Sequence, residues 1–153
     1  LDAGSFGYGL LAGALGLGSV LGILVMPRLR GRLSSEHVVV TSSVLWGGGV
    51  IAFAGAPNVA LGVVCVLVVG AAQMATMNTF WSRYLLELPD WLRGRGTSLS
   101  MLVVWFGMSL GSSVWSSVAA ASSVATALTV VAVCHVGMAL VGRTMLEMVD
   151  ATN

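Results

Sequence analysis

The sequence has very little charge for its length. It contains no lysine, and its seven basic residues (all arginine) and six acidic residues make up only 8% of the chain. A soluble domain carries about 25% charged residues, which it needs on its water-facing surface. Apolar residues reach 57%, and the mean hydropathy is +0.95. The shortage of charge therefore excludes an ordinary soluble domain and predicts that lipid surrounds most of the chain.

Other scarcities exclude further classes of protein. A net charge of +1 gives no electrostatic reason to expect a nucleic-acid partner. The two cysteines, Cys65 and Cys134, lie inside apolar runs and predict no disulfide framework. His37 and His135 are far apart in the sequence, and each lacks a plausible second metal ligand nearby. HExxH, CxxC and P-loop patterns are missing. We therefore expect no catalytic residue, no metal and no cofactor, and predict that the chain is not an enzyme.

Five long apolar runs dominate what is present. A bilayer core of about 30 Å needs about 20 apolar residues in a helix, and the runs cover residues 8–26, 38–56, 59–80, 98–118 and 124–141. Pro27 is expected to end the first helix, and Thr97 or Ser98 is the candidate N-cap of the fourth. The runs predict an all-α integral membrane protein, with polar loops at residues 27–37 and 81–97.

The arginines indicate the topology. Helices that cross in turn place the segments after the first, third and fifth runs on one side of the membrane. All seven arginines fall in those segments: Arg28, Arg30, Arg32, Arg83, Arg93, Arg95 and Arg143. Since basic residues concentrate on the cytoplasmic side, we predict a multi-pass plasma-membrane protein with its N-terminus outside and its C-terminus inside.

Small residues recur at four-residue spacing in the first and fourth runs. This spacing stacks them on one face of a helix and lets a neighbouring helix approach closely. The predicted packing residues are Gly9, Gly13, Gly18, Gly22, Gly107 and Gly111. The second run contains Gly47-Gly48-Gly49, which predicts either a bend or a close contact.

One polar stretch carries a family resemblance. The segment Pro89-Asp-Trp-Leu-Arg-Gly-Arg-Gly96, followed by a helix with small residues, resembles the loop between the tenth and eleventh helices of the major facilitator superfamily. The residues from Tyr8 to Gly22 and the pair Asn78-Thr79 resemble, more closely, the eighth and tenth helices of bacterial exporters of the enterobactin-exporter type. The resemblance extends from about Gly7 to Val141.

The resemblance implies that the five helices are the eighth to twelfth of twelve. Residues 1–153 would then form a partial C-terminal transmembrane domain, and the N-terminal half of the same protein would be missing upstream. In one loop the chain departs from the family pattern, because Met26 stands where family members often have an acidic residue. Arg28, Arg30 and Arg32 are therefore expected to orient the first helix rather than form a charge lock. We expect Arg93 and Arg95 to anchor the second loop at the cytoplasmic surface.

The resemblance also implies roles for the helices. The third would line a central cavity, the first and fourth would pack against the missing half, and the second and fifth would be peripheral. The predicted substrate pathway is Gln73, Met74, Met77 and Asn78. Two alternatives remain open: the amides form hydrogen bonds that only hold helices together, and the methionines only pack.

These features predict a secondary active transporter that exports small, fairly apolar molecules (drug-like or siderophore-like) by alternating access. A proton gradient would drive it, although no acidic residue lies inside a predicted span. The expected partners are the cargo and the bilayer. Two alternatives stay open: a non-transporting five-helix scaffold or subunit, and the permease subunit of an ATP-driven exporter.

Overall fold

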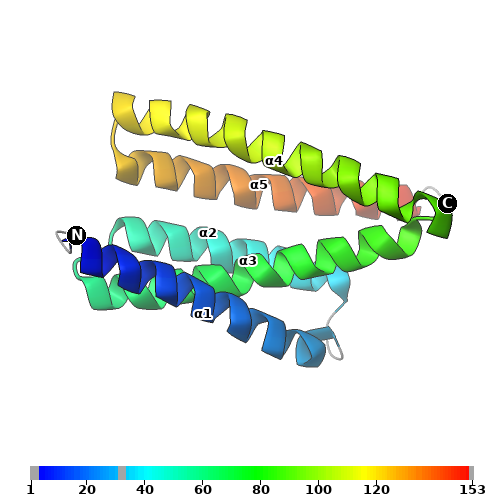
Figure 1. The fold of residues 1–153 in the computed structure, drawn as a ribbon, viewed down its shortest axis with the longest axis horizontal. Coiled ribbons are helices and arrows are strands. Elements are labelled where there is room, and N and C mark those ends of the chain that lie inside the picture. The colour runs from blue at the N-terminus through cyan, green and yellow to red at the C-terminus, as the bar shows by residue number, and fades with distance from the viewer. Residues whose placement is uncertain (1–3, 31–33, 152–153) are drawn as a thin grey trace.

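The structure is a computed structural model that describes residues 4–30 and 34–151, with side chains for residues 4–28, 34 and 36–142. The described chain is five α-helices (Figure 1). Their bounds are α1 Gly4–Arg30, α2 Ser35–Ala54, α3 Val59–Glu87, α4 Asp90–Ala121 and α5 Val124–Ala151. All five contain an apolar segment long enough to cross a membrane. The described part of the chain is therefore all-helical, with five candidate membrane spans.

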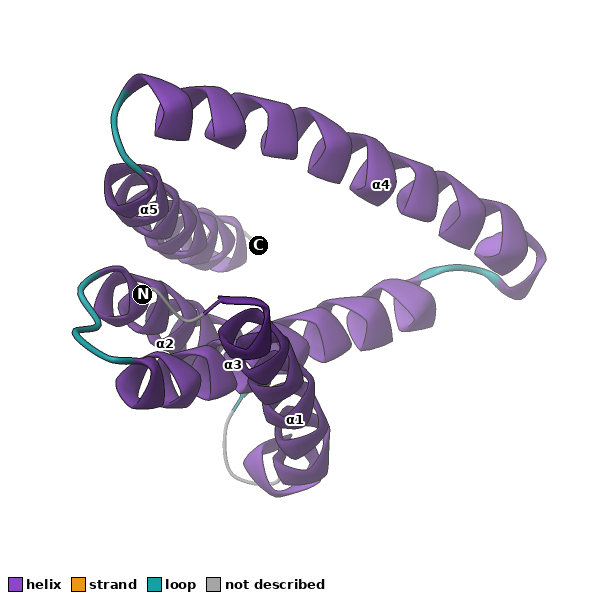
Figure 2. Cartoon of the chain, turned by 60° about the vertical axis from the view of Figure 1, so that its left-hand side comes forward, coloured by secondary structure: helices purple, strands orange, loops and turns teal. Residues whose placement is uncertain are grey.

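Helix α3 lies at the centre of the assembly. It packs extensively against α1 and α2, and α2 packs in turn against α5. Helix α4 extends away from the α1–α3 group and meets α5 near the turn that joins the two helices (Figure 2). None of the residues of α4 is buried. The described helices thus form a packed group of α1, α2, α3 and α5, with α4 standing largely free of it.

Glycines bring the backbones of α1 and α3 together. A Cβ atom at Gly18 would overlap the carbonyl oxygen of Leu67, and one at Gly22 would lie 2.5 Å from the carbonyl oxygen of Ala71. From the other side, a Cβ at Gly70 would overlap the carbonyl oxygen of Leu15. Only glycine fits at these positions, because the neighbouring atoms belong to the backbone of the facing helix.

The three consecutive glycines of α2 have different environments. A Cβ at Gly47 would lie 2.5 Å from Cγ2 of Val136 in α5, and one at Gly49 would lie 2.7 Å from Cγ2 of Val69 in α3. A Cβ at Gly48 would have no atom within 4 Å. Helix α2 lies between two partners, so two of the three glycines serve close contacts. The helix continues through all three to Ala54 without a break.

All five helices extend beyond their apolar runs at one or both ends, although α2 ends at Ala54, two residues before the predicted end of its run. Two further expectations are corrected. Helix α1 does not end before Pro27 but continues to Arg30. The proline removes only its own backbone donor, and the following residues still complete the last turn. Helix α4 begins at Asp90, so Thr97 and Ser98 are not N-caps. Both instead donate hydrogen bonds back to carbonyl oxygens four residues earlier. Most of the predicted loop 81–97 is consequently helical.

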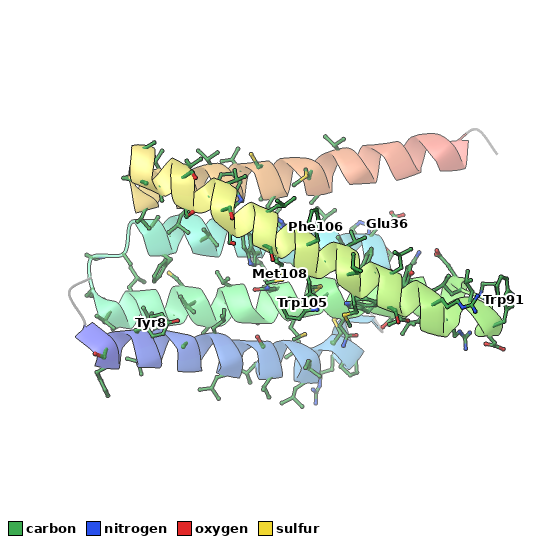
Figure 3. All side chains as sticks on the ribbon, turned by 45° about the horizontal axis from the view of Figure 1, so that its top comes forward. Tyr8, Glu36, Trp91, Trp105, Phe106 and Met108 are labelled. Carbon is green, nitrogen blue, oxygen red and sulfur yellow. The ribbon has the colours of Figure 1, made fainter. Side chains whose placement is uncertain are left out.

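The serines of α4 bond within their own helix. Ser109 Oγ donates to the carbonyl oxygen of Trp105 at 3.0 Å, and Ser113 Oγ and Ser117 Oγ each donate to a carbonyl one turn earlier. These bonds satisfy the hydroxyl groups without a partner helix. The exposed side chains of Trp105, Phe106 and Met108 also project from α4 (Figure 3). Helix α4 therefore has an apolar outer surface and internally satisfied hydroxyls.

Candidate functional site

Helix α3 has two open faces on opposite sides. Its buried residues include Cys65, Val69, Ala72, Ala75 and Thr79, at spacings of three and four. One open face carries Gln73 and Met77, and continues at the same helical spacing to Tyr84. The other carries Val68 and Ala71. Ala71 and Gln73 are two positions apart and so point in nearly opposite directions.

The predicted pathway residues divide between these environments. Gln73 is exposed, and its amide makes no hydrogen bond to any described residue; Met77 is 37% exposed. Met74 is half-buried. Asn78 is also half-buried, and Ser82 Oγ donates to its carbonyl oxygen at 2.7 Å and to its Oδ1 at 3.4 Å. The structure therefore brings Gln73 and Met77 together on an open face, and places Met74 and Asn78 off that face.

Hydroxyl groups supply the polar contacts between the packed helices. Ser19 Oγ on α1 donates to the carbonyl oxygen of Leu15 at 2.9 Å and lies 3.5 Å from that of Gly70 on α3. Ser42 Oγ on α2 lies 2.8 Å from Thr76 Oγ1 on α3. The amides of Gln73 and Asn78 were predicted from the sequence as the polar groups of this helix instead. Serine and threonine were missed because their hydroxyls are equally well satisfied by their own helix.

One tyrosine, Tyr84 of α3, links the end of α3 to the start of α4 by hydrogen bonds; we call this region the Tyr84 joint. Tyr84 OH donates to the carbonyl oxygen of Gly96 at 2.9 Å and accepts from Ser100 Oγ at 2.6 Å. Gly96 is closely packed, because a Cβ there would lie 3.1 Å from Tyr84 OH. The ring also contacts Phe80 and Trp81. Since Tyr84 lies on the same face of α3 as Gln73, it fixes the start of α4 on that side.

The arginines that were predicted as anchors are exposed where the structure describes them. Arg93 Nη1 forms an ion pair with Asp90 Oδ1 at 2.7 Å, and its Nε donates to the carbonyl oxygen of Leu88 at 3.2 Å. These contacts hold the first turn of α4. Arg95 and Arg28 are also exposed, and Arg28 Nη1 lies 3.5 Å from the carbonyl oxygen of Leu24. Arg32 and the side chain of Arg30 lie outside the described residues.

The predicted packing glycines fall into two groups. Gly18 and Gly22 face the backbone of α3, as described above. A Cβ at any of the remaining four would meet no atom within 4 Å; these are Gly9, Gly13, Gly107 and Gly111. The second group leaves open surface on α1 and α4.

Two features that suggest chemistry have structural explanations. Residues Gly107-Met-Ser-Leu-Gly111 match the G-x-S-x-G pattern of hydrolases, which requires a sharp strand-to-helix turn. Here Ser109 lies inside α4 and bonds to its own helix. His135 of α5 packs against Trp46 of α2 with 4.6 Å between ring centroids. The described residues also contain no group of three or more potential metal ligands. Neither feature forms an active site.

Comparison with known protein families agrees with the long apolar helices. A family model described as transmembrane secretion effector matches residues 1–153, which is the whole chain. The chain belongs to this family. The family lies within the major facilitator superfamily, so the chain is a multi-pass membrane protein of a transporter family and not an enzyme. Comparisons with curated proteins and with solved structures gave no match.

Proposed function

We propose that this secretion-effector family member is a secondary active exporter of small, fairly apolar molecules. The face of α3 that carries Gln73 and Met77 would line its substrate pathway, and alternating access would move the cargo. The observation that carries the proposal is the exposed amide of Gln73, which bonds to no described residue, on this largely apolar helix. An amide facing hydrocarbon would lose its hydrogen bonds with water at a cost of several kcal/mol, whereas an amide facing a wet pathway keeps them.

The neighbourhood of this face supports the same assignment. Met77 offers a flexible, polarizable surface to an apolar cargo, and Tyr84 places the start of α4 on this side of α3. The open glycines of α1 and α4 provide surfaces for a further set of helices. We propose that α1 to α5 are the eighth to twelfth helices of a twelve-helix transporter of enterobactin-exporter type, and that an N-terminal half completes the pathway.

The orientation follows the arginines. We propose that the ends of α1, α3 and α5 lie at the cytoplasmic surface of a bacterial plasma membrane, because the arginines gather there. This places the Tyr84 joint near the cytoplasmic entrance, and Gln73 about 16 Å deeper along α3 at about 1.5 Å per residue.

Transport in everted membrane vesicles tests the function. With ethidium as the probe, we expect uptake into vesicles that maintain a proton gradient and loss of that uptake when a protonophore collapses the gradient. Gln73→Leu should lower the uptake rate while leaving the amount of folded protein unchanged. Uptake that needs ATP but survives the protonophore would contradict proton coupling. Absence of uptake for ethidium and for uncharged dyes would contradict export of small apolar molecules.

Thiol labelling tests which face of α3 meets water. In a background with Cys65→Ala and Cys134→Ala, we expect a membrane-impermeant maleimide to label Gln73→Cys and Met77→Cys. The matched control is Val68→Cys on the opposite face. A water-soluble reagent does not enter the apolar surroundings of Val68, so labelling there should be at least roughly tenfold slower. Equal labelling rates at Val68→Cys and Gln73→Cys would contradict the pathway assignment.

A further inference from the structure

A groove runs along the face of α3 opposite Gln73. Helices α1 and α2 both pack on α3 but barely contact each other, so they diverge and leave a groove between them. It has a volume of about 290 Å³. Its lining includes Leu21 and Val25 on α1, Val38 and Leu45 on α2, and Val68 and Ala71 on α3. The lining is therefore almost wholly apolar, and the one buried hydroxyl, that of Ser42, is already bonded to Val38 and Thr76.

The dimensions of the groove match one leaflet of a membrane. Its lining on α3 extends from Leu67 to Ala75, which corresponds to about 12 Å at about 1.5 Å per residue. Half of a bilayer core is about 15 Å thick. Several lining side chains remain open to the outside, including Leu21 and Leu45 at 45% and 51% exposure. An apolar chain that lies along the groove would thus traverse most of one leaflet.

One end of the groove is polar and basic. Arg28 follows the lining residue Val25 by three positions on α1, which is less than one helical turn. On α2, Ser34 precedes the lining residue Val38 by one turn, and its Oγ lies 2.7 Å from Nδ1 of His37. Glu36 is two positions from Val38 and therefore points away from the groove (Figure 3). No ion pair to Arg28 is formed by the described residues.

We propose that the groove binds an anionic phospholipid. One acyl chain lies between α1 and α2 against Val68 and Ala71, and the phosphate lies at the end of the groove beside Arg28 and Ser34. Along the groove, a cation and a hydroxyl are followed by about 12 Å of apolar lining. A phospholipid has the same order of chemistry, from its charged headgroup to its acyl chains. The bound lipid fills the gap between two helices that make few contacts of their own.

Native mass spectrometry of the detergent-purified protein tests the site, with phosphatidylglycerol and phosphatidylcholine as probes. The parent should retain phosphatidylglycerol about fivefold better, which is the preference that one basic residue gives near an anionic headgroup. Arg28→Gln should abolish this preference, whereas Arg95→Gln on the distant α4 should keep it. Val68→Trp, which fills the groove, should reduce retention of both lipids, and Val133→Trp on the exposed surface of α5 should reduce neither.

Several outcomes would overturn the proposal. One is equal retention of the two lipids by the parent. Another is equal retention by the Val68→Trp and Val133→Trp variants, which would indicate that another protein segment or ordinary annular lipid covers the groove. Each variant must elute from gel filtration like the parent. A Val68→Trp variant that misfolds is replaced by Leu45→Trp, which enters the groove from α2 and carries the same expectation.

Discussion

Replacing Gly18 by leucine is expected to disrupt most of the packing between α1 and α3. The new Cβ would overlap the carbonyl oxygen of Leu67, with the carbonyl carbon and Cα of Leu67 at 2.9 and 3.0 Å. Overpacking costs about 1–3 kcal/mol when side chains can yield. Here the obstacle is the backbone of α3, so the two helices must separate. We expect a loss of about 3 kcal/mol or more, which corresponds to a melting temperature lower by roughly 10 °C.

The measurement is thermal unfolding of the detergent-solubilised protein, followed by gel filtration with fluorescence detection. The matched control is Gly16→Leu on the same helix, where a Cβ meets no atom within 4 Å. Leucine is a better helix former than glycine, so this control should be as stable as the parent or slightly more stable. Equal melting temperatures for Gly18→Leu and the parent would mean that α1 and α3 do not cross at Gly18.

The sequence predicted the helices better than it predicted their ends. Hydropathy identifies the apolar part of a helix, and each of the five apolar runs lies in a long helix apart from the last two residues of the second run. It does not report how far a helix continues into water, because polar side chains are compatible with a helix there. Helix α4 begins eight residues before the predicted span because Arg93 is held by Asp90 and because Thr97 and Ser98 bond back to the same helix.

The contacts between helices were less predictable. Four-residue spacing marks Gly9, Gly13, Gly18 and Gly22 alike, but only the last two face α3. Small residues show that a close approach is possible, whereas the position of the neighbouring helix decides where it happens. Tyr84 illustrates the same limit. An aromatic residue at the end of an apolar run is typical of a membrane interface, and its bonds to α4 depend on how the chain turns at Leu88 and Pro89.

Alanine substitutions at the three consecutive glycines of α2 should change the free energy of unfolding differently at each position. Gly47→Ala brings a methyl group to 2.5 Å from Cγ2 of Val136, and Gly49→Ala brings one to 2.7 Å from Cγ2 of Val69. Each should lower the free energy of unfolding by about 1–2 kcal/mol. Gly48→Ala enters open space and should raise it by about 0.5–1 kcal/mol, because alanine is the better helix former. Equal effects at the three positions would indicate a bend in α2 rather than contacts on both sides.

A second substitution separates a side-chain obstacle from a backbone obstacle. Val136→Ala removes the methyl group that Gly47→Ala would meet, so the double variant should be more stable than the sum of the single effects predicts, by about 1 kcal/mol. The corresponding pair of Gly18→Ala and Leu67→Ala should show no such rescue, since the carbonyl oxygen of Leu67 remains in place. Melting temperatures of the four single and two double variants decide the matter. Rescue of Gly18→Ala by Leu67→Ala would contradict the backbone contact. Rescue at Gly47 alone would indicate that α5 contacts α2 through side chains that can adjust, and that α1 contacts α3 through its main chain.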